Sequence, residues 1–139
     1  MAYYSLMLGK FGLALFVWGL LIGALIPKFR NPRMSLSAHL TAVQSGTFLL
    51  AMGAFWQEFA IPESIQAVIG WSLVLSSSFL IIGLLLSAAT GASRVLPIAG
   101  AGHKGSPGHE KLVAIIVLAS SVWMLAGAGA CLWFFLIAN

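Results

Sequence analysis

The chain has 139 residues, enough for one domain, of which 60% are hydrophobic and only 7% are charged. A soluble domain of this size keeps roughly a third of its surface in water, so it cannot bury this much apolar surface. The composition excludes a soluble globular enzyme and a disordered chain, and the single Cys excludes a disulfide scaffold. The solvent must be lipid. The net charge of +4 is too sparse for a nucleic-acid surface and suits a topology signal instead.

Four apolar segments follow one another along the chain, at residues 11–26, 40–56, 65–89 and 112–138. A helix needs about 20 residues to cross a bilayer core of roughly 30 Å. With their flanks, the segments predict helices over approximately residues 4–26, 32–58, 65–90 and 111–138. Helix breakers separate them at Pro27, at Pro62 and in the Gly- and Pro-rich stretch 91–109. We therefore predict an all-α fold, an integral membrane four-helix bundle that forms a single domain over residues 1–139.

The basic residues indicate how this bundle is oriented. Six of them lie between the first and second helices or between the third and fourth, whereas the opposite side has only one, Lys10, with the acids Glu58 and Glu63. Positively charged loops stay in the cytoplasm. We expect both termini outside the cytoplasm, in a bacterial inner membrane. The six basic residues are Lys28, Arg30, Arg33, Arg94, Lys104 and Lys111.

The second predicted helix contains a histidine among small residues. Asn31 and Pro32 are typical of an N-cap followed by Pro at the first helical position, which puts His39 roughly 10 to 12 Å inside the helix. Two interpretations remain open for its face: a groove for close helix packing, or a groove kept open for a planar ligand on His39, in which Ala42 and Gly46 would contact the ligand. The residues on the face of His39 are Ser35, Ala42, Gly46 and Gly53.

Helix one has a similar row of small residues, Gly12, Gly19 and Gly23, with no ionisable group on the same face. Packing against another helix is enough to explain that row. The serines of helices two, three and four are expected to be structural for the same kind of reason, because a Ser in a membrane helix usually hydrogen-bonds its own backbone or a neighbouring helix.

The stretch between helices three and four contains two motifs of low specificity. Residues 100–105 match GxGxxG, but no strand precedes them, so we do not expect a dinucleotide site. His103, His109 and Glu110 fit no common metal-ligand spacing, and a solvated loop is the simpler interpretation. All three acids lie at helix ends or in loops, which argues against a proton-coupled exporter because such a transporter usually needs an intramembrane carboxylate.

His39 is the polar residue that is hardest to explain by packing alone. A neutral imidazole is tolerated in lipid but needs a partner, and helices one, three and four have neither a carboxylate nor a second His for it. A plausible partner is haem iron, with His39 as axial ligand and the sixth position open.

Two stretches of the chain resemble the hydroxylaminobenzene mutase family of small integral membrane proteins. One is Asn31-Pro-Arg-Met-Ser-Leu-Ser-Ala-His-Leu40, continuing through Gly46 to residues 48–50. The other is Leu96-Pro-Ile-Ala-Gly-Ala-Gly-His-Lys-Gly105, followed by Glu110. More distantly, residues 39–46 are similar to styrene oxide isomerase, a four-helix membrane protein that assembles as a trimer with haem b between subunits.

This resemblance implies an activity and a cofactor. Members of the mutase family convert aryl hydroxylamines to 2-aminophenols by an intramolecular shift of the hydroxyl group, and in the wider group the His that matches His39 is the axial haem ligand. The chain departs from both patterns at Ser45, where an Asn is usual, and at Ser76, Ser77 and Ser78, where a Tyr and Asn cluster is usual. These departures remove amide and phenol donors from the region expected to face substrate.

We therefore expect a membrane mutase acting on aryl hydroxylamines, with haem b on His39 and ferric iron as a Lewis acid on the N–O oxygen. Gln44, Ser45 and Ser78 are the residues expected to orient the substrate. The expected partners are a small aromatic substrate, the lipid bilayer and two further copies in a homotrimer, with no nucleic acid. The alternatives are an aryl epoxide isomerase of the same architecture, a non-catalytic haem-binding redox or sensor subunit, and a small transporter.

Overall fold

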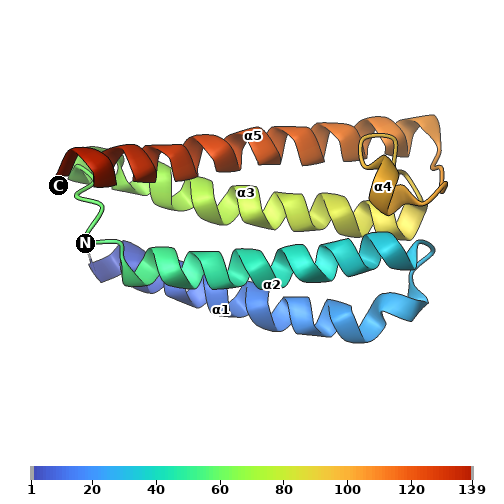
Figure 1. Cartoon of the computed structure of the whole chain (residues 1–139), viewed down its shortest axis with the longest axis horizontal. Helices are drawn as coiled ribbons and strands as arrows, with labels where there is room; N and C mark the ends of the chain where they lie inside the picture. Colours follow the sequence, from blue (N-terminus) through green and yellow to red (C-terminus); the bar gives the residue numbers. More distant parts are fainter. Residues whose placement is uncertain (1, 139) are drawn as a thin grey trace.

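The computed structural model describes residues 2–138, which form helices and no strands (Figure 1). Four long helices run side by side with alternating direction, so that the N- and C-termini lie at one end of the molecule and the short helix α4 lies at the other. The elements are α1 (Ala2–Leu25), the 3-10 turn η1 (Ile26–Lys28), α2 (Pro32–Ala54), α3 (Glu63–Thr90), α4 (Pro97–Gly100) and α5 (Pro107–Ala138). The all-α fold predicted from the sequence is confirmed.

The four long helices form two hairpins, and α3 joins them. Helices α1 and α2 pair closely along their length, and α3 pairs with α5. Helix α3 also packs on α2 and more lightly on α1, whereas within the described residues α5 packs on no long helix except α3. The outer sides of α1, α2 and α5 are therefore left uncovered by the chain itself.

Three of the long helices are long and apolar enough to cross a membrane, at Tyr3–Lys28, Glu63–Thr90 and Pro107–Ile137. Their exposed side chains are mostly large and apolar, as lipid contact requires, and Leu125 and Val122 are examples. Helix α2 has 23 residues and includes several polar side chains, and it does not reach the same hydropathy. The chain is a membrane protein in which α2 is the least lipid-compatible of the long helices.

Local sequence explains where most helices begin and end. The Asn31 side chain caps α2 by accepting a hydrogen bond from the Met34 backbone N–H at 3.1 Å, and Pro32 is the first helical residue, as predicted. Helix α3 ends at Gly91, whose φ of +79° is a left-handed conformation that favours glycine. Two boundaries differ from those expected: α2 ends at Ala54 rather than near residue 58, because residues 55–59 form turns, and α5 begins at Pro107 rather than near residue 111.

Two apolar clusters fill the space between the hairpins. One lies near the end with the termini and includes Leu8, Leu49, Trp56 and Leu73. The other lies nearer to α4, where Met34, Ala38 and Ala42 of α2 pack against α3. The residues of α3 in this second cluster are Ile81, Leu84 and Ala88. The second cluster is on the same stretch of α2 as His39 and fixes the rotation of that helix.

Candidate functional site at the contact between helices α1 and α2

Glycines let the backbones of α1 and α2 approach each other. A Cβ added to Gly46 would lie 2.6 Å from the Phe16 backbone N and 2.7 Å from the Gly12 carbonyl O, distances that real Cβ atoms do not reach. At the other end of the contact, Ser5 Oγ donates a hydrogen bond of 2.5 Å to the Gly53 carbonyl. The small-residue rows of both helices are thus a packing surface, which is the first of the two interpretations given for them.

His39 sits at the edge of this contact and is held by α1. Its Nδ1 lies 2.7 Å from the Gly19 carbonyl O. A carbonyl oxygen only accepts hydrogen bonds, so Nδ1 must be the protonated nitrogen. Its ring also lies against Gly23, where an added Cβ would be 2.8 Å from Nδ1 and 2.9 Å from Cε1. The glycine row of α1 therefore does more than pack backbones, because Gly23 makes room for the imidazole.

In the neutral form of the ring, this geometry leaves Nε2 as the unprotonated nitrogen, with its lone pair free to bind a ligand. Among the described residues, the imidazole of His39 has no hydrogen-bond partner other than the Gly19 carbonyl. The residue is half-buried, so one edge of the ring is accessible from the outside of the chain. Histidine ligands of metals commonly have this arrangement, in which the second ring nitrogen donates to a backbone carbonyl and fixes the orientation of the ring.

The other small residues on the face of His39 do not leave an open groove in one chain. Ala42 and Gly46 are buried, and both lie against α1, at Gly19 and Phe16 respectively. Ser35, one turn before His39, is fully buried, and its Oγ has no hydrogen-bond partner among the described residues. The space beside Ala42 and Gly46 is therefore occupied by α1, and only His39 itself reaches the margin of this face.

The three residues expected to orient a substrate are separated by the fold. Gln44 is exposed on the outer side of α2, away from the core. Ser45 is 8% exposed and lies on the inner side of α2, on the same face as Ala38, Ala42 and Leu49. Ser78 is half-buried on α3, and its hydroxyl donates to the Val74 carbonyl at 2.8 Å. Within one chain, no hydrogen bond among the described residues joins any of the three to His39.

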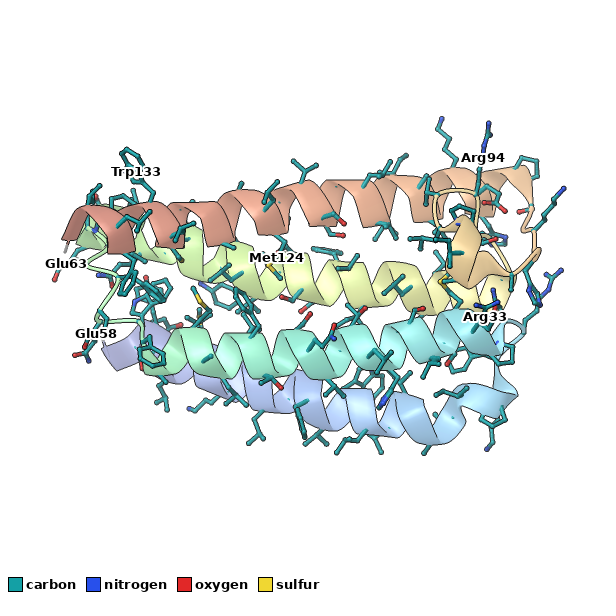
Figure 2. The ribbon with its side chains drawn as sticks, viewed as in Figure 1. Arg33, Glu58, Glu63, Arg94, Met124 and Trp133 are labelled. Carbon is teal, nitrogen blue, oxygen red and sulfur yellow. The ribbon has the colours of Figure 1, made fainter. Side chains whose placement is uncertain are left out.

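The remaining serines of α3 and α5 behave as expected for membrane helices. Ser77 donates to the Leu73 carbonyl at 2.7 Å, and Ser121 donates to the Val117 carbonyl at 2.7 Å. Ser76 makes a contact between helices, with Met124 Sδ at 3.6 Å, and Figure 2 shows Met124 on the side of α5 that faces α3. These hydroxyls find hydrogen-bond partners within the chain, so they need no ligand.

The stretch between α3 and α5 is exposed over most of residues 101–109, as expected for a solvated loop, but it is also held in one arrangement by hydrogen bonds. The Glu110 carboxylate accepts hydrogen bonds from the backbone N–H groups of Ser93, Arg94 and Gly105, at 3.3, 2.8 and 2.8 Å. Ser93 Oγ donates to the His103 carbonyl at 2.6 Å. The Glu110 carboxylate thus holds residues near both ends of the loop against the start of α5. The sequence analysis did not predict this role.

Asn31 ties this loop to the other hairpin. Its side-chain amide donates to the carbonyls of Ala99 and Gly100, at 3.2 and 3.0 Å, while its backbone N–H donates to the Ala88 carbonyl at 3.0 Å. The two conspicuous sequence motifs, one beginning at Asn31 and the other spanning residues 96–105, therefore meet in space. The presence of both motifs in one sequence was the available sign of this contact. A search for catalytic side chains does not detect such a sign.

Packing explains Gly100 and Gly105, whereas Gly102 has a φ of +84°, a left-handed conformation that favours glycine. A Cβ at Gly105 would lie 2.7 Å from the Ala92 Cβ, and one at Gly100 would overlap Ser93. No group of three His, Cys, Asp or Glu side chains comes together as a metal site within residues 2–138. His103 instead directs its Nδ1 at the Gly100 carbonyl at 3.0 Å, and His109 pairs with the Ser106 hydroxyl at 2.9 Å.

The fold and this site define a small helical membrane protein in which one histidine, His39, lies at the contact between two long helices and has one ring nitrogen without a hydrogen-bond partner among the described residues. A family model described as styrene oxide isomerase matches residues 4–136. Two curated relatives from Ectopseudomonas oleovorans are similar to the chain. Hydroxylaminobenzene mutase HabB is 35% identical over 125 residues, covering 89% of this chain and 76% of the relative. Hydroxylaminobenzene mutase HabA is 33% identical over 107 residues, covering 76% of this chain and 79% of the relative.

The chain therefore belongs to the styrene oxide isomerase family, and it is an enzyme, an intramolecular mutase. This confirms the family resemblance drawn from residues 31–40 and 96–105. No solved structure matches the chain significantly.

Proposed function

We propose that this enzyme rearranges aryl hydroxylamines to 2-aminophenols within the membrane, using a haem held by His39. The observation that carries the proposal is the imidazole of His39, whose Nδ1–H is fixed by the Gly19 carbonyl at 2.7 Å so that Nε2 is available. The names of the two relatives, both hydroxylaminobenzene mutases, support the choice of substrate.

The orientation of the His39 ring supports a haem as its ligand. A haem with one protein ligand needs an imidazole of fixed orientation, and the hydrogen bond to Gly19 fixes that orientation. When bound, a ferric haem would supply a Lewis acid toward the oxygen of the substrate N–O group. His39 would hold it from the outer edge of the α1–α2 contact, because α1 already fills the space beside Ala42 and Gly46.

The overall change is an isomerisation that balances without a second reactant. The N–O bond breaks, a C–O bond forms at the ortho carbon, and the hydrogen on that carbon is transferred to nitrogen. No oxidant, reductant or water is consumed. The chain contributes a site whose surroundings are apolar helices, so water is kept from the ring carbon and the oxygen returns to the same molecule.

A homotrimer would complete the site. Gln44 presents an amide on the exposed side of α2, and an amide in contact with lipid is unfavourable unless it finds a partner. Helix α2 is also the long helix that does not reach the hydropathy of a candidate span. We propose that neighbouring copies cover this side of α2, which would bring Gln44 toward a substrate held between subunits, with Ser45 and Ser78 acting from inside each chain.

Native mass spectrometry in a mild detergent tests this assembly. A trimer is expected, and a monomer under conditions that retain activity would contradict it. Exchanging Gln44 for Leu should make lipid contact more favourable and weaken binding of substrate, measured as a raised KM.

The proposed location is a bacterial inner membrane with the basic end in the cytoplasm. Figure 2 shows Arg33 and Arg94 at the end opposite the termini, and Glu58 and Glu63 at the end with the termini. Positive residues favour the cytoplasmic side, so both termini would face outward. Reporter fusions after Lys104 should report cytoplasm, and fusions after Asn139 should report the outside. The reverse pattern would show that the charge rule does not orient this protein.

The decisive experiment compares haem content and activity in three histidine variants of the detergent-purified protein. His39→Ala should lose the Soret band and turnover of phenylhydroxylamine together, while His103→Ala and His109→Ala should keep both, because their rings are bonded within the loop region. Full haem retention in His39→Ala would overturn the proposal.

A second candidate function, isomerisation of aryl epoxides, is favoured by the description of the matching family model. The two candidates share the site but differ in the group that the site must accept. Incubating the protein with a panel of aryl hydroxylamines and aryl epoxides, and resolving the products, separates them. Turnover of epoxides alone would replace the first candidate by the second.

A further inference from the structure

A cavity of about 1100 Å³ lies beside α4, at the end of the molecule opposite the termini. Its walls come from the loop after α3 and from the first two turns of α5. Three basic side chains line it, Arg94, Lys104 and Lys111, and all three are exposed. The candidate site at His39 uses none of these residues.

The charge of this cavity is positive, and its one acid is already engaged. Glu110 also lines the cavity, but its two carboxylate oxygens accept the three backbone N–H groups of Ser93, Arg94 and Gly105. With three cations and one acid, the lining has a net formal charge of +2. Arg94 also interacts electrostatically with the Glu110 carboxylate, whereas no described residue pairs with Lys104 or Lys111, so these two ammonium groups are available to an anion from outside the chain.

The rest of the lining is apolar and continues into an apolar surface. Val95, Pro97 and Ala114 form part of the wall. Ala114 and Lys111 share a face of α5 with Leu118, Val122 and Leu125, by the periodicity of the helix. Those last three are 57%, 68% and 74% exposed, and among the described long helices α5 packs on α3 alone, so the described residues leave this face uncovered. A ligand that fits both parts has an anionic head and an apolar tail.

We propose that this cavity binds the headgroup of an anionic phospholipid, with the phosphate between Arg94, Lys104 and Lys111 and the acyl chains along the exposed face of α5. Basic pockets at the end of membrane helices attract anionic headgroups, whereas a soluble phosphate would gain nothing from the apolar wall. The proposal does not depend on the reaction catalysed at His39.

Binding of short-chain phosphatidylglycerol to the full-length protein in a non-ionic detergent tests the proposal, with native mass spectrometry counting bound lipids per protomer. Phosphatidylglycerol should bind more tightly than phosphatidylcholine of the same chain length. Lys104→Gln combined with Lys111→Gln should weaken the binding of phosphatidylglycerol by about tenfold or more. The matched control, Lys28→Gln combined with Arg33→Gln, removes two charges from the same end but from outside the cavity and should bind like the unmodified protein.

Two further experiments identify the ligand and provide a test that does not depend on the folding of the double Lys variant. Ala114→Trp fills the cavity without changing its charge and should also weaken the binding of phosphatidylglycerol. This variant tests whether the cavity is the binding site if the double Lys variant does not fold. Three results would overturn the proposal: equal binding of the two lipids, equal weakening in the control variant, or displacement of the lipid by inorganic phosphate at similar concentration. The last result would assign the cavity to a soluble anion.

Discussion

The two helical hairpins are held together in different ways. Between α1 and α2, a Cβ added at Gly46 would meet backbone atoms at 2.6 and 2.7 Å. Between α3 and α5, a Cβ added at Gly83 would meet side-chain atoms, with the Cγ2 methyl groups of Ile116 and Val117 nearest, at 2.9 and 3.0 Å. Two backbones can separate only if the helices move apart, whereas a branched side chain can shift by a few tenths of an ångström at a smaller cost. The first contact is therefore rigid, and the second can adapt.

Polar groups follow the same division. In the first hairpin, Ser5 and His39 donate hydrogen bonds across to the partner helix. In the second, Ser77 and Ser121 donate within their own helices, and the contact across to the partner helix is a long one, from Ser76 to Met124 Sδ at 3.6 Å. A residue that must hold a ligand in one orientation belongs on the rigid contact, and His39 lies there. The comparison teaches that the candidate site is built on the hairpin whose geometry has the least freedom.

The largest effect is expected from a bulky residue in the rigid contact. Gly46→Val would force α1 and α2 apart, and we expect a loss of about 3 kcal/mol in the free energy of unfolding. Unfolding in denaturing detergent, followed by circular dichroism, measures it. Gly129→Val on α5 is the matched control, because an added Cβ there has nothing within 4 Å. Equal losses in both would remove the distinction between the hairpins.

Asn31 tests the connection between the hairpins. Asn31→Asp keeps the oxygen that caps α2 but replaces the amide that donates to Ala99 and Gly100, at a site that is fully buried. We expect the free energy of unfolding to fall by about 2 kcal/mol and hydrogen exchange to become faster in residues 96–105. Asn31→Ala, which also removes the cap, should lose more. Unchanged exchange in Asn31→Asp would mean that the cap alone matters.

Gly23→Ala tests whether the rigid contact positions the imidazole. The added Cβ would overlap the ring of His39, and we expect haem affinity to fall about tenfold while the helices stay paired. Titration of the haem-free protein, followed at the Soret band, gives the affinity. Gly9→Ala on the same helix has nothing within 4 Å of the new Cβ and should leave haem affinity unchanged. This prediction depends on the proposed role of His39.

The smallest effect is expected in the adaptable contact. Gly83→Ala should lower the free energy of unfolding by about 1 kcal/mol, because a gain in helix propensity only partly offsets the shift of the branched side chains of Ile116 and Val117. Gly46→Ala has the same gain in propensity and should be clearly less stable. Thermal unfolding of the two variants side by side isolates the packing difference.

Much of the fold follows from local sequence. Asn31 and Pro32 predicted the start of α2, and the glycine row of the first helix predicted a packing surface, because caps and periodicity depend on neighbours in the chain. The partner of His39 could not be predicted this way. Periodicity gives the face on which a residue lies, but only the register of α1 against α2 puts Gly19 and Gly23 opposite the ring.

The loop before α5 shows the same limit more strongly. The Asn31 amide bonds to residues 68 and 69 positions away, and no local pattern specifies such a contact. Glu110 looked like a solvated acid because its acceptors are satisfied by backbone N–H groups, which every sequence has. Long-range hydrogen bonds to backbone leave little trace in residue types, apart from the glycines that make room for them.

The acceptor for the His39 Nδ1–H is a main-chain oxygen, that of Gly19. Mutation of a side chain cannot delete a carbonyl group, so the protonation pattern of the ring is protected against single substitutions in a way that a carboxylate partner would not be. Residues that shape the substrate region can then be exchanged, in nature or in directed evolution, while the ligating nitrogen stays the same. A scaffold of this kind separates the part of the site that must be constant from the part that can be redesigned.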